Sequence, residues 1–370
     1  MEGLDLPHLP LSDDAHHAPH GQPSILRKFG DGSGAQQVFG PADPQQPALQ
    51  TRESVVLRWR AVRAIYAVAR AIYPAGGKRI LVKRLRFLVR ALHSFSIWQH
   101  WYMFLQSSPF GAIARYYPRL YEKPFRPYLH MDLTHTECHR ILREHYLFLR
   151  RQAPAGFVAA ILGNKPFLLN EDSVDDLREP LILNLTYAKH MQQEGELTLS
   201  IGRPDSVYMH AEHQWIASLT FVVQYGAAGW EILIGGVQGG HAGKSKEDIK
   251  FATHVFHGLR PKHFLVYILR EVAAAWGVSR IYAISDAAHC FMRRRYRDRV
   301  YKMKSSYDAL WRDVGGRLAA HGFYLIPAGN PQRLIQTVPS RKRAQYLRRF
   351  AMLDSIKSEI HAKLATAGKS

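Results

Sequence analysis

A short strand of the buried type, Arg280 to Ser285, precedes two side chains that could move a proton. Asp286 follows the strand directly and His289 lies three residues further on. Ligand sites in open sheets lie beyond the carboxyl ends of the strands, so we expect both side chains to line such a site. Histidine titrates near pH ~6.5, which suits a general base, and Asp286 could orient its ring. The alternative is a histidine that caps a turn or is satisfied in the core.

Two tyrosines and one glutamate complete the candidate catalytic residues. Tyr296 and Tyr307 could return a proton to a leaving group, because a phenol is a donor at neutral pH. Glu231 is a competing base on the strand that leads to a glycine-rich loop. Its alternative is a carboxylate on the exposed face of that strand.

The loop after this strand is rich in glycine and contains a lysine near its end. It reads Gly235-Gly236-Val237-Gln238-Gly239-Gly240-His241-Ala242-Gly243-Lys244-Ser245. Glycine lets a backbone approach phosphate closely, amide N–H groups can point inward, and Lys244 adds positive charge. Gly243 to Ser245 matches the end of a P-loop, but the first glycine of that motif falls on Gln238, which disfavours nucleotide hydrolysis. A tight turn without a ligand is the remaining alternative.

Histidines and a cysteine also gather at two other places. They are His135, Glu137, Cys138 and His139 in one segment and His254, His257 and His263 in the other. The first segment lacks a third ligand at metal-binding spacing and the second lacks a carboxylate, so we expect no metal. Cys290 beside His289 could serve as a thiol nucleophile, but no third residue orients that pair.

Charge is distributed unevenly along the 370 residues. The chain has 50 Lys and Arg against 30 Asp and Glu, which gives a formal charge of +20. Residues 1–50 hold six acidic and two basic residues, seven prolines and six glycines, without apolar periodicity. This composition predicts a disordered tail, because it cannot bury enough apolar surface to offset the loss of chain entropy. The positive charge therefore belongs to the folded part.

Residues 51–92 predict two amphipathic helices with a basic surface. They contain eleven basic residues and one acidic residue, and Pro74 to Gly77 separates the helices. Such helices suit an anionic membrane surface, although a helical subdomain with a solvated arginine face is the alternative. Residues 293–304 add seven basic residues against one acidic residue. Lipid headgroups or the phosphates of an acyl donor explain this run as well as nucleic acid does, but no nucleic-acid recognition motif accompanies it. Together with the amphipathic helices, the run favours a membrane surface.

The carboxyl half predicts a mixed sheet flanked by helices. Its elements are strands at 215–223, 230–237, 280–285 and 323–326 and helices at 264–276 and from the N-cap Ser306 onward. The first two strands surround a glycine turn and should form an antiparallel hairpin. We therefore predict an α/β (α+β) fold: a tail at 1–50, a basic helical subdomain at 51–190 and an α/β domain at 191–365.

The order strand, glycine-rich loop, long helix, strand, helix, strand resembles the core of GNAT-type acyltransferases. In that family a loop grips the pyrophosphate of acyl-CoA at a helix amino terminus. The resemblance implies acyl-CoA or acyl carrier protein as donor, an amine nucleophile that attacks a thioester, and a sheet that splays open beside Gln238 to Lys244. The residues predicted to bind the carrier are Gln238, Gly239, Gly240, Gly243, Lys244, Arg260 and Lys262.

Several blocks in the carboxyl half form a specific set. They are Ile234 to Gly239, Gly258 to Lys262, His289 to Arg297, Tyr307-Asp308 with Trp311, and Arg341 to Tyr346. In these blocks the chain is similar to the VirK/YbjX family of bacterial proteins, over roughly residues 75 to 365. The resemblance implies a role in envelope integrity, resistance to cationic antimicrobial peptides and virulence factor display, and it supplies no established reaction.

Two functional hypotheses account for these features. The first is a cytoplasmic protein on the inner-membrane surface that transfers an acyl or aminoacyl group to an envelope component. The second is a non-enzymatic envelope-stress or regulatory factor that binds an anionic partner, either lipid or nucleic acid. A cytoplasmic location is expected because the sequence lacks a secretory signal pattern and a run of ~18 apolar residues.

Overall fold

Helices form the first part of the chain, where apolar residues recur at helical spacing. The structure is a computed structural model and describes residues 47–170, 181–203, 215–239, 245–293, 306–331 and 334–365. The first elements are α1 (Pro47–Ile72), α2 (Lys78–His93), α3 (Phe95–Ser107), α4 (Gly111–Tyr116) and the 3-10 helix η2 (Pro118–Phe125). α1 begins inside the stretch predicted as a tail and ends before Pro74, as predicted.

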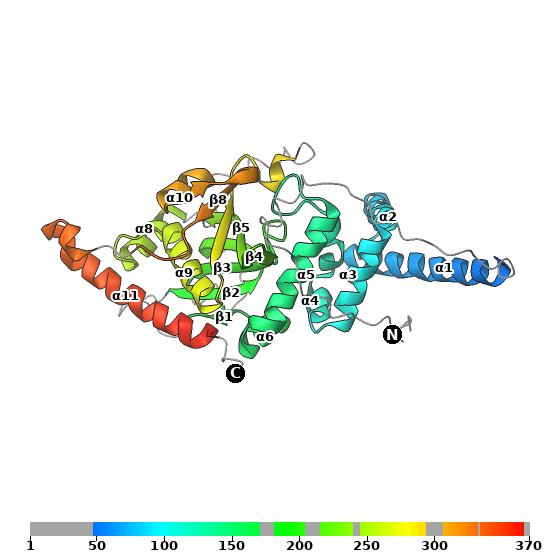
Figure 1. Ribbon diagram of the computed structural model, residues 1–370, viewed down its shortest axis with the longest axis horizontal. Helices are drawn as coiled ribbons and strands as arrows, with labels where there is room; N and C mark the ends of the chain where they lie inside the picture. The colour runs from blue at the N-terminus through cyan, green and yellow to red at the C-terminus, as the bar shows by residue number, and fades with distance from the viewer. Residues whose placement is uncertain are drawn as a thin grey trace.

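These amino-terminal helices enclose a hydrophobic core of their own. Ile65 and Ala69 of α1, Phe87 of α2, Trp98 of α3 and Phe125 of η2 pack together in it. The helices lie together at one end of the molecule (Figure 1). A basic helical region therefore precedes the sheet, as the sequence indicates.

Among the described residues, eight strands form one mixed sheet in the order β1-β2-β3-β4-β5-β6-β8-β7. Their bounds are β1 Phe167–Leu168, β2 Ile182–Tyr187, β3 Leu197–Gly202, β4 Trp215–Gly226, β5 Gly229–Gly239, β6 Arg280–Ile284, β7 Arg317–Leu318 and β8 Phe323–Ile326. Neighbours are antiparallel except β5 and β6, which run parallel. The predicted mixed α/β fold and the β4–β5 hairpin are confirmed.

The sheet begins earlier in the chain than residue 191, where the sequence analysis placed the α/β domain. β1 and β2 lie in the stretch predicted to hold helices and loops. In β2 the apolar residues Leu183, Leu185 and Tyr187 alternate with the polar residues Asn184 and Thr186, and four of its six residues are buried. The period that identifies a strand is therefore present in this short segment, and the prediction of helices and loops there is wrong.

Helices cover the sheet and meet around Trp276. Its ring contacts Phe148 of α5 (His135–Gln152), Phe157 of α6 (Ala155–Leu162) and Phe221 of β4. Trp276 directly follows α9 (Pro261–Ala275), so these three helices share one core with the sheet.

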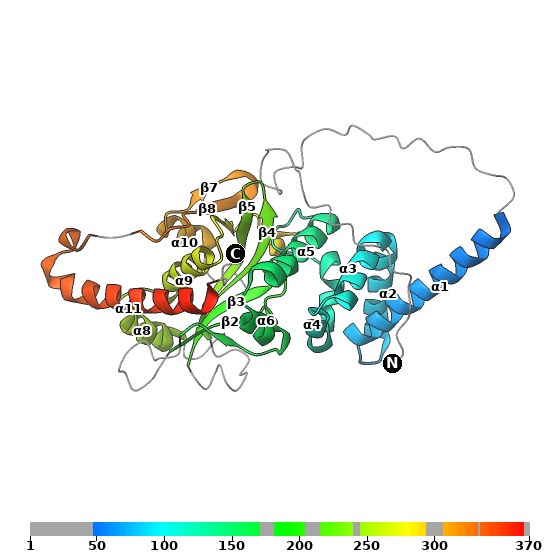
Figure 2. The ribbon, with the colours of Figure 1, turned by 60° about the horizontal axis from the view of Figure 1, so that its bottom comes forward.

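The remaining elements lie in the carboxyl half. They are α8 (Ser245–Val255), η3 (Cys290–Met292), α10 (Tyr307–Asp313), η5 (Ala320–Gly322), η6 (Ile335–Thr337) and α11 (Ser340–Leu364). α11 packs on α9, where His361 lies 3.0 Å from the Glu271 carboxylate. α11 and the amino-terminal helices occupy opposite ends of the molecule (Figure 2). Within the described ranges, no helix combines the length and apolar content needed to cross a membrane.

Candidate functional site

The β5 and β6 strands pair along only part of β5. Their parallel ladder runs from Glu231 opposite Arg280 to Ile234 opposite Ala283, whereas β5 continues beside β4 to Gly239. Thr220 of β4 pairs with Gly236 and Phe221 pairs with Ile234, so Gly235 is an extra, bulged residue. Among the described residues, the last part of β5 therefore has no strand partner on its β6 side.

His289 occupies part of this edge and is fully buried. Its Nδ1 accepts a hydrogen bond from the Phe291 N–H at 3.2 Å, so its Nε2–H donates to the Gly235 carbonyl oxygen at 3.1 Å. Burial lowers the pKa of His289 to about 4. The ring is therefore neutral at pH 7, with both nitrogens engaged, and it matches the alternative of a capping, core-satisfied histidine.

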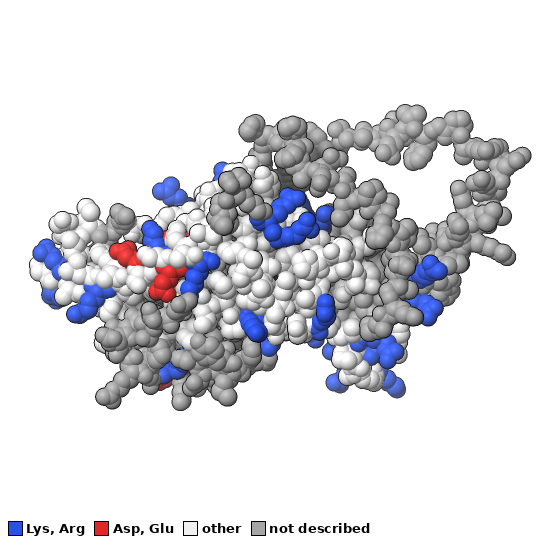
Figure 3. Space-filling view, turned by 90° about the horizontal axis from the view of Figure 1, so that it is seen from below, with Lys and Arg blue, Asp and Glu red and all other residues white. Residues whose placement is uncertain are grey.

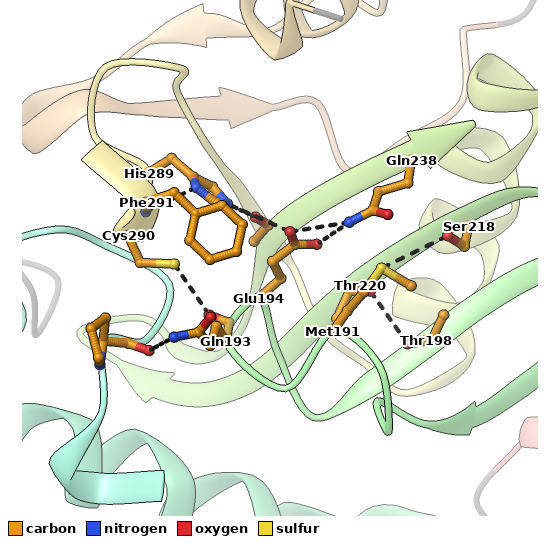
Figure 4. Close-up of polar contacts among 12 residues, drawn as sticks. Met191, Gln193, Glu194, Thr198, Ser218, Thr220, Gln238, His289, Cys290 and Phe291 are labelled. Atoms are coloured by element: carbon orange, nitrogen blue, oxygen red, sulfur yellow. Dashed lines mark hydrogen bonds and ion pairs between the residues drawn. The ribbon is translucent and has the colours of Figure 1, made fainter. Parts of the chain in front are cut away.

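Glu194, which the sequence analysis did not select, faces the same edge. Its buried carboxylate accepts hydrogen bonds from the Gln238 amide, at 3.2 Å to each oxygen, and its Oε1 lies 3.9 Å from the His289 Nε2. Figure 4 shows Glu194 between these two side chains. Burial raises the pKa of Glu194 to about 8. Of His289 and Glu194, Glu194 is the group whose pKa lies closer to neutral pH.

Glycines explain how Glu194 reaches β5. A Cβ on Gly236 would overlap the Glu194 carboxylate, and a Cβ on Gly235 would overlap its carbonyl oxygen. Gly195, the next residue, lies so close to Phe221 that a Cβ there would be 2.5 Å from the carbonyl oxygen of Phe221. The local sequence thus fits the segment before β3 closely against β4 and β5.

Tyr307 lies beside His289, and Asp286 is hydrogen-bonded to the start of α10. The rings of Tyr307 and His289 are 5.8 Å apart, edge to face. Burial and the Glu194 carboxylate raise the pKa of Tyr307 well above its usual value, against a hydrogen bond from the Val237 backbone. The Tyr307 hydroxyl is therefore protonated and lies at β5.

Asp286 holds the start of α10 rather than the His289 ring. Its carboxylate accepts hydrogen bonds from the Ser306 hydroxyl at 2.7 Å and from the Tyr307 N–H at 2.8 Å. Its own N–H donates to the Asp308 carboxylate at 2.9 Å. Asp286 therefore positions Tyr307, whereas the sequence analysis assigned it to orienting His289.

Glu231 lies at the other end of β5, opposite Arg280 at the start of β6. It precedes Gln238 by seven residues, which corresponds to roughly 23 Å along a strand. Its side chain is fully buried, so the reading of an exposed strand carboxylate is wrong. Gln224 donates to it at 3.4 Å, and burial raises its pKa. The structure does not bring Glu231 to His289 and Glu194.

Two basic residues of the predicted carrier site lie near the end of β5. A Cβ on Gly239 would be 3.9 Å from the Cε of Lys262, which lies in the first turn of α9 after the N-cap Arg260. Burial lowers the pKa of Lys262. Positive side chains at a helix amino terminus favour an anion, whereas the first turn of α8 holds Glu247 and Asp248, which disfavour one. Gly240, Gly243, Lys244 and Tyr296 lie outside the described residues.

The histidine and cysteine groups of the sequence analysis do not converge. In the described part of the chain, no three His, Cys, Asp or Glu side chains are placed to hold a metal ion. The Cys290 thiol is buried and donates to the Gln193 carbonyl oxygen at 3.6 Å. Burial lowers the pKa of His139 to about 4.

The arrangement can move a proton beside an open strand edge. A carboxyl group whose pKa is near 8 is mainly protonated at pH 7, and its ionised fraction can take a proton from an ammonium or hydroxyl group, while a protonated phenol can donate one. Glu194 had one signal in the sequence: together with Glu196 it flanks a glycine immediately before an apolar strand. The contact with Gln238 joins residues 44 positions apart, and no local pattern reveals it.

Comparisons with known proteins agree with the family resemblance. A family model described as "Protein of unknown function (DUF535)" matches residues 76–362. The chain is 31% identical over 278 residues to "Uncharacterized protein YbjX" of Escherichia coli K12, covering 75% of this chain and 82% of that protein. It is 26% identical over 224 residues to an uncharacterized protein of Haemophilus influenzae, covering 60% and 68% of the two chains. No solved structure gives a significant match. The chain therefore belongs to the VirK/YbjX family, DUF535, whose function is unknown.

Proposed function

We propose that the protein is an acyl- or aminoacyltransferase that uses acyl-CoA or acyl carrier protein as donor. The observation that carries this proposal is that, among the described residues, Gly235 to Gly239 of β5 have no strand partner on the β6 side. This edge of β5 faces Glu194. The Gly235 carbonyl oxygen and the Val237 backbone at this edge already bond to His289 and Tyr307, so an amide-containing carrier would add its hydrogen bonds toward the half-buried Gln238 and Gly239. The order of the described elements β5, α8, α9, β6, α10, β7 and β8 is the one on which the proposed likeness to GNAT-type acyltransferases rests.

Glu194 and Tyr307 are the groups we assign to proton transfer. In the ionised fraction of Glu194, which grows as the pH rises toward 8, the carboxylate takes the proton of an amine nucleophile as its nitrogen attacks the thioester carbon. The carbon–sulfur bond then breaks, and the leaving thiolate takes a proton from the Tyr307 hydroxyl, which the Glu194 proton replaces through solvent. His289 fixes the bulged strand through Gly235, and Asp286 fixes Tyr307. Lys262 and Arg260 supply positive charge for the phosphates of the donor.

We place the reaction at the cytoplasmic surface of the inner membrane, with an envelope component as acceptor. The basic amino-terminal helices support the membrane address. The resemblance to VirK/YbjX proteins supports an envelope substrate and a part in resistance to cationic antimicrobial peptides, which a less anionic envelope attracts less strongly.

Titration calorimetry with acyl-CoA and with acylated carrier protein tests donor binding. We expect micromolar binding of one of them, weakened about tenfold by Lys262→Gln through loss of one charge-assisted contact. Lys165→Gln, which removes an exposed lysine elsewhere, should leave binding unchanged. Glu194→Gln should keep donor binding and lose transfer to an amine. Folded protein that binds neither donor would contradict the proposal.

That last result would favour the second candidate, a non-enzymatic factor that binds an anionic partner. One observation favours this candidate: both residues first selected for catalysis, His289 and Asp286, are engaged in hydrogen bonds that hold the local backbone. A binding protein needs such rigidity as much as an enzyme does.

A further inference from the structure

Helix α2 carries an apolar strip that no part of the described chain covers. Leu81, Leu85 and Val89 are 58%, 56% and 58% exposed, and Leu92 is 43% exposed. At about 100° per residue, these four side chains fall in one strip about 80° wide along the helix. Val82 lies at its border and is 45% exposed. This strip is large for a water-facing helix surface.

A row of basic side chains runs along the same helix next to the strip. It consists of Arg79, Lys83 and Arg86, which are exposed, and Arg90, which is half-buried. These residues fall in a second strip, centred about 130° from the first. α2 contains no acidic residue. On the face drawn in Figure 3, basic side chains appear over the amino-terminal helices, whereas the acidic ones gather near α11.

The third side of α2 is fixed to the protein. Phe87 and Ala91 are buried in the amino-terminal core. The Arg84 guanidinium donates to the carbonyl oxygens of Tyr73 and Ala75 at 2.6 Å and 2.9 Å, which caps the end of α1. The helix is therefore held in one orientation, and its apolar strip points outward.

We propose that α2 is an interfacial helix, which we call the lipid-facing helix, that lies on an anionic lipid bilayer. Leu81, Leu85, Val89 and Leu92 enter the boundary between headgroups and acyl chains, while the basic row contacts lipid phosphates. This proposal rests on the membrane-surface part of the proposed function and assigns it to one helix face. It does not depend on the transfer chemistry.

The two strips together select lipid over other partners. Nucleic acid would use the basic row and leave four large aliphatic side chains in water. A second copy of this chain would bury the apolar strips but would bring two rows of like charge together. An anionic bilayer satisfies both strips along a helix that lies in its plane.

Vesicle co-sedimentation of the full chain tests the proposal, with phosphatidylcholine vesicles and with vesicles that also contain phosphatidylglycerol. We expect binding to the anionic vesicles, weakened by added salt. Leu85→Gln with Val89→Gln should lower this affinity at least about tenfold, since two aliphatic groups no longer enter the bilayer. The matched control, Leu318→Gln with Leu334→Gln, removes two side chains that are 66% and 67% exposed elsewhere and should leave binding unchanged.

Two further double variants test whether the basic row of α2, rather than the overall positive charge of the protein, binds the vesicles. Lys83→Gln with Arg86→Gln should weaken binding to anionic vesicles several-fold, and Lys342→Gln with Arg348→Gln, on α11, should not. Unchanged binding by the Leu85/Val89 variant would overturn the proposal, as would equal binding to neutral vesicles. If the unsubstituted protein does not bind vesicles but forms a concentration-dependent dimer, and the Leu85/Val89 variant does not form that dimer, the apolar strip binds a second copy of the chain. Acyl donor binding, measured separately, should persist in all four variants, so its absence would contradict the transferase and not the lipid contact.

Discussion

The Glu194 carboxylate lies almost wholly out of water, 2% exposed, with the Gln238 amide as its donor. Burial disfavours the charged form, which raises its pKa to about 8. His289 is buried beside it and also stays neutral, because burial lowers its pKa to about 4. At pH 7 the two groups therefore face each other without forming an ion pair.

The raised pKa of Glu194 predicts a loss of stability as the pH rises. The folded protein keeps the proton up to about pH 8, whereas an unfolded glutamate releases it near pH ~4.3. The free energy of unfolding should therefore fall between these two pH values, by on the order of 5 kcal/mol from this group. Glu194→Gln mimics the neutral acid and should remove this part of the pH dependence.

Urea unfolding of both proteins from pH 5 to pH 9 measures the effect. All other titrating groups are shared, so the difference between the two curves isolates Glu194. We expect the difference to favour the variant increasingly from pH 5 to about pH 8 and to level off above it. Parallel curves over the whole range would show that the carboxylate is not desolvated as described.

Side-chain types near the site could be predicted from the sequence, but their roles could not. His289 and Tyr307 were selected and do lie together, because both follow the predicted strand at β6. Glu194 was missed because its partner lies on another strand. Arg84 looks like one more surface charge in a basic helix, yet it caps α1.

At the scale of elements, the bulged strand β5 decides where the site lies. Gly235 and Gly236 are the positions at which the chain before β3 crosses it. The ladder of β5 with β6 ends at Ile234, whereas its ladder with β4 continues to Gly239. The bulge also directs the Gly235 carbonyl oxygen toward His289.

Gly236→Ala should therefore disturb both stability and the site. The added Cβ overlaps the Glu194 carboxylate, and we expect a loss of about 1–3 kcal/mol in unfolding free energy. Transfer activity should fall with it, because Glu194 must move away from Gln238. Gly156→Ala in α6 meets no atom within 4 Å and should be neutral or slightly stabilising, which makes it the matched control. Equal stability of the two variants in chemical unfolding would refute the close packing.

A clear period predicted several elements correctly, but it did not define every boundary, and the short strand β2 was missed. The hairpin of β4 and β5, helix α9 and strand β8 follow from alternation, helical spacing and glycine turns. Leu310, Trp311, Val314 and Leu318 recur at helical spacing after Ser306 and indicate a helix that reaches Leu318. Helix α10 ends at Asp313, and Leu318 lies exposed on β7. The pairing of β7 with β8 determines where α10 ends, and the local sequence contains no signal for that pairing.

For the whole molecule, a buried ion pair links the helical region to the sheet. Lys123 of η2 forms it with Glu196, the residue before β3, and both side chains are almost fully buried. The hydroxyls of Tyr128 and Tyr146 donate to the same carboxylate at 2.9 Å and 2.7 Å. The Lys123 ammonium also donates to the Gly195 carbonyl oxygen at 3.0 Å.

Removing one partner should cost far more than removing both. Lys123→Met leaves the Glu196 charge buried, and we expect a loss of about 3–5 kcal/mol of unfolding free energy. Lys123→Met with Glu196→Gln should recover a large part of that loss, because no uncompensated charge remains. Lys165→Met, at an exposed lysine, should change stability by less than about 0.5 kcal/mol. Calorimetric or urea unfolding of the four proteins decides this, and a double variant as unstable as the single one would refute it.

The spacing of Glu194 and Glu196 around Gly195 has a consequence for how the chain can change in length. Each added residue advances a strand by roughly 3.3 Å, which is about the length of a hydrogen bond. An insertion or deletion between the two glutamates would therefore carry one of them past its partners, Gln238 or Lys123, while the other stayed in place. We expect natural variants of this chain to differ in length at other loops and to keep these three positions contiguous.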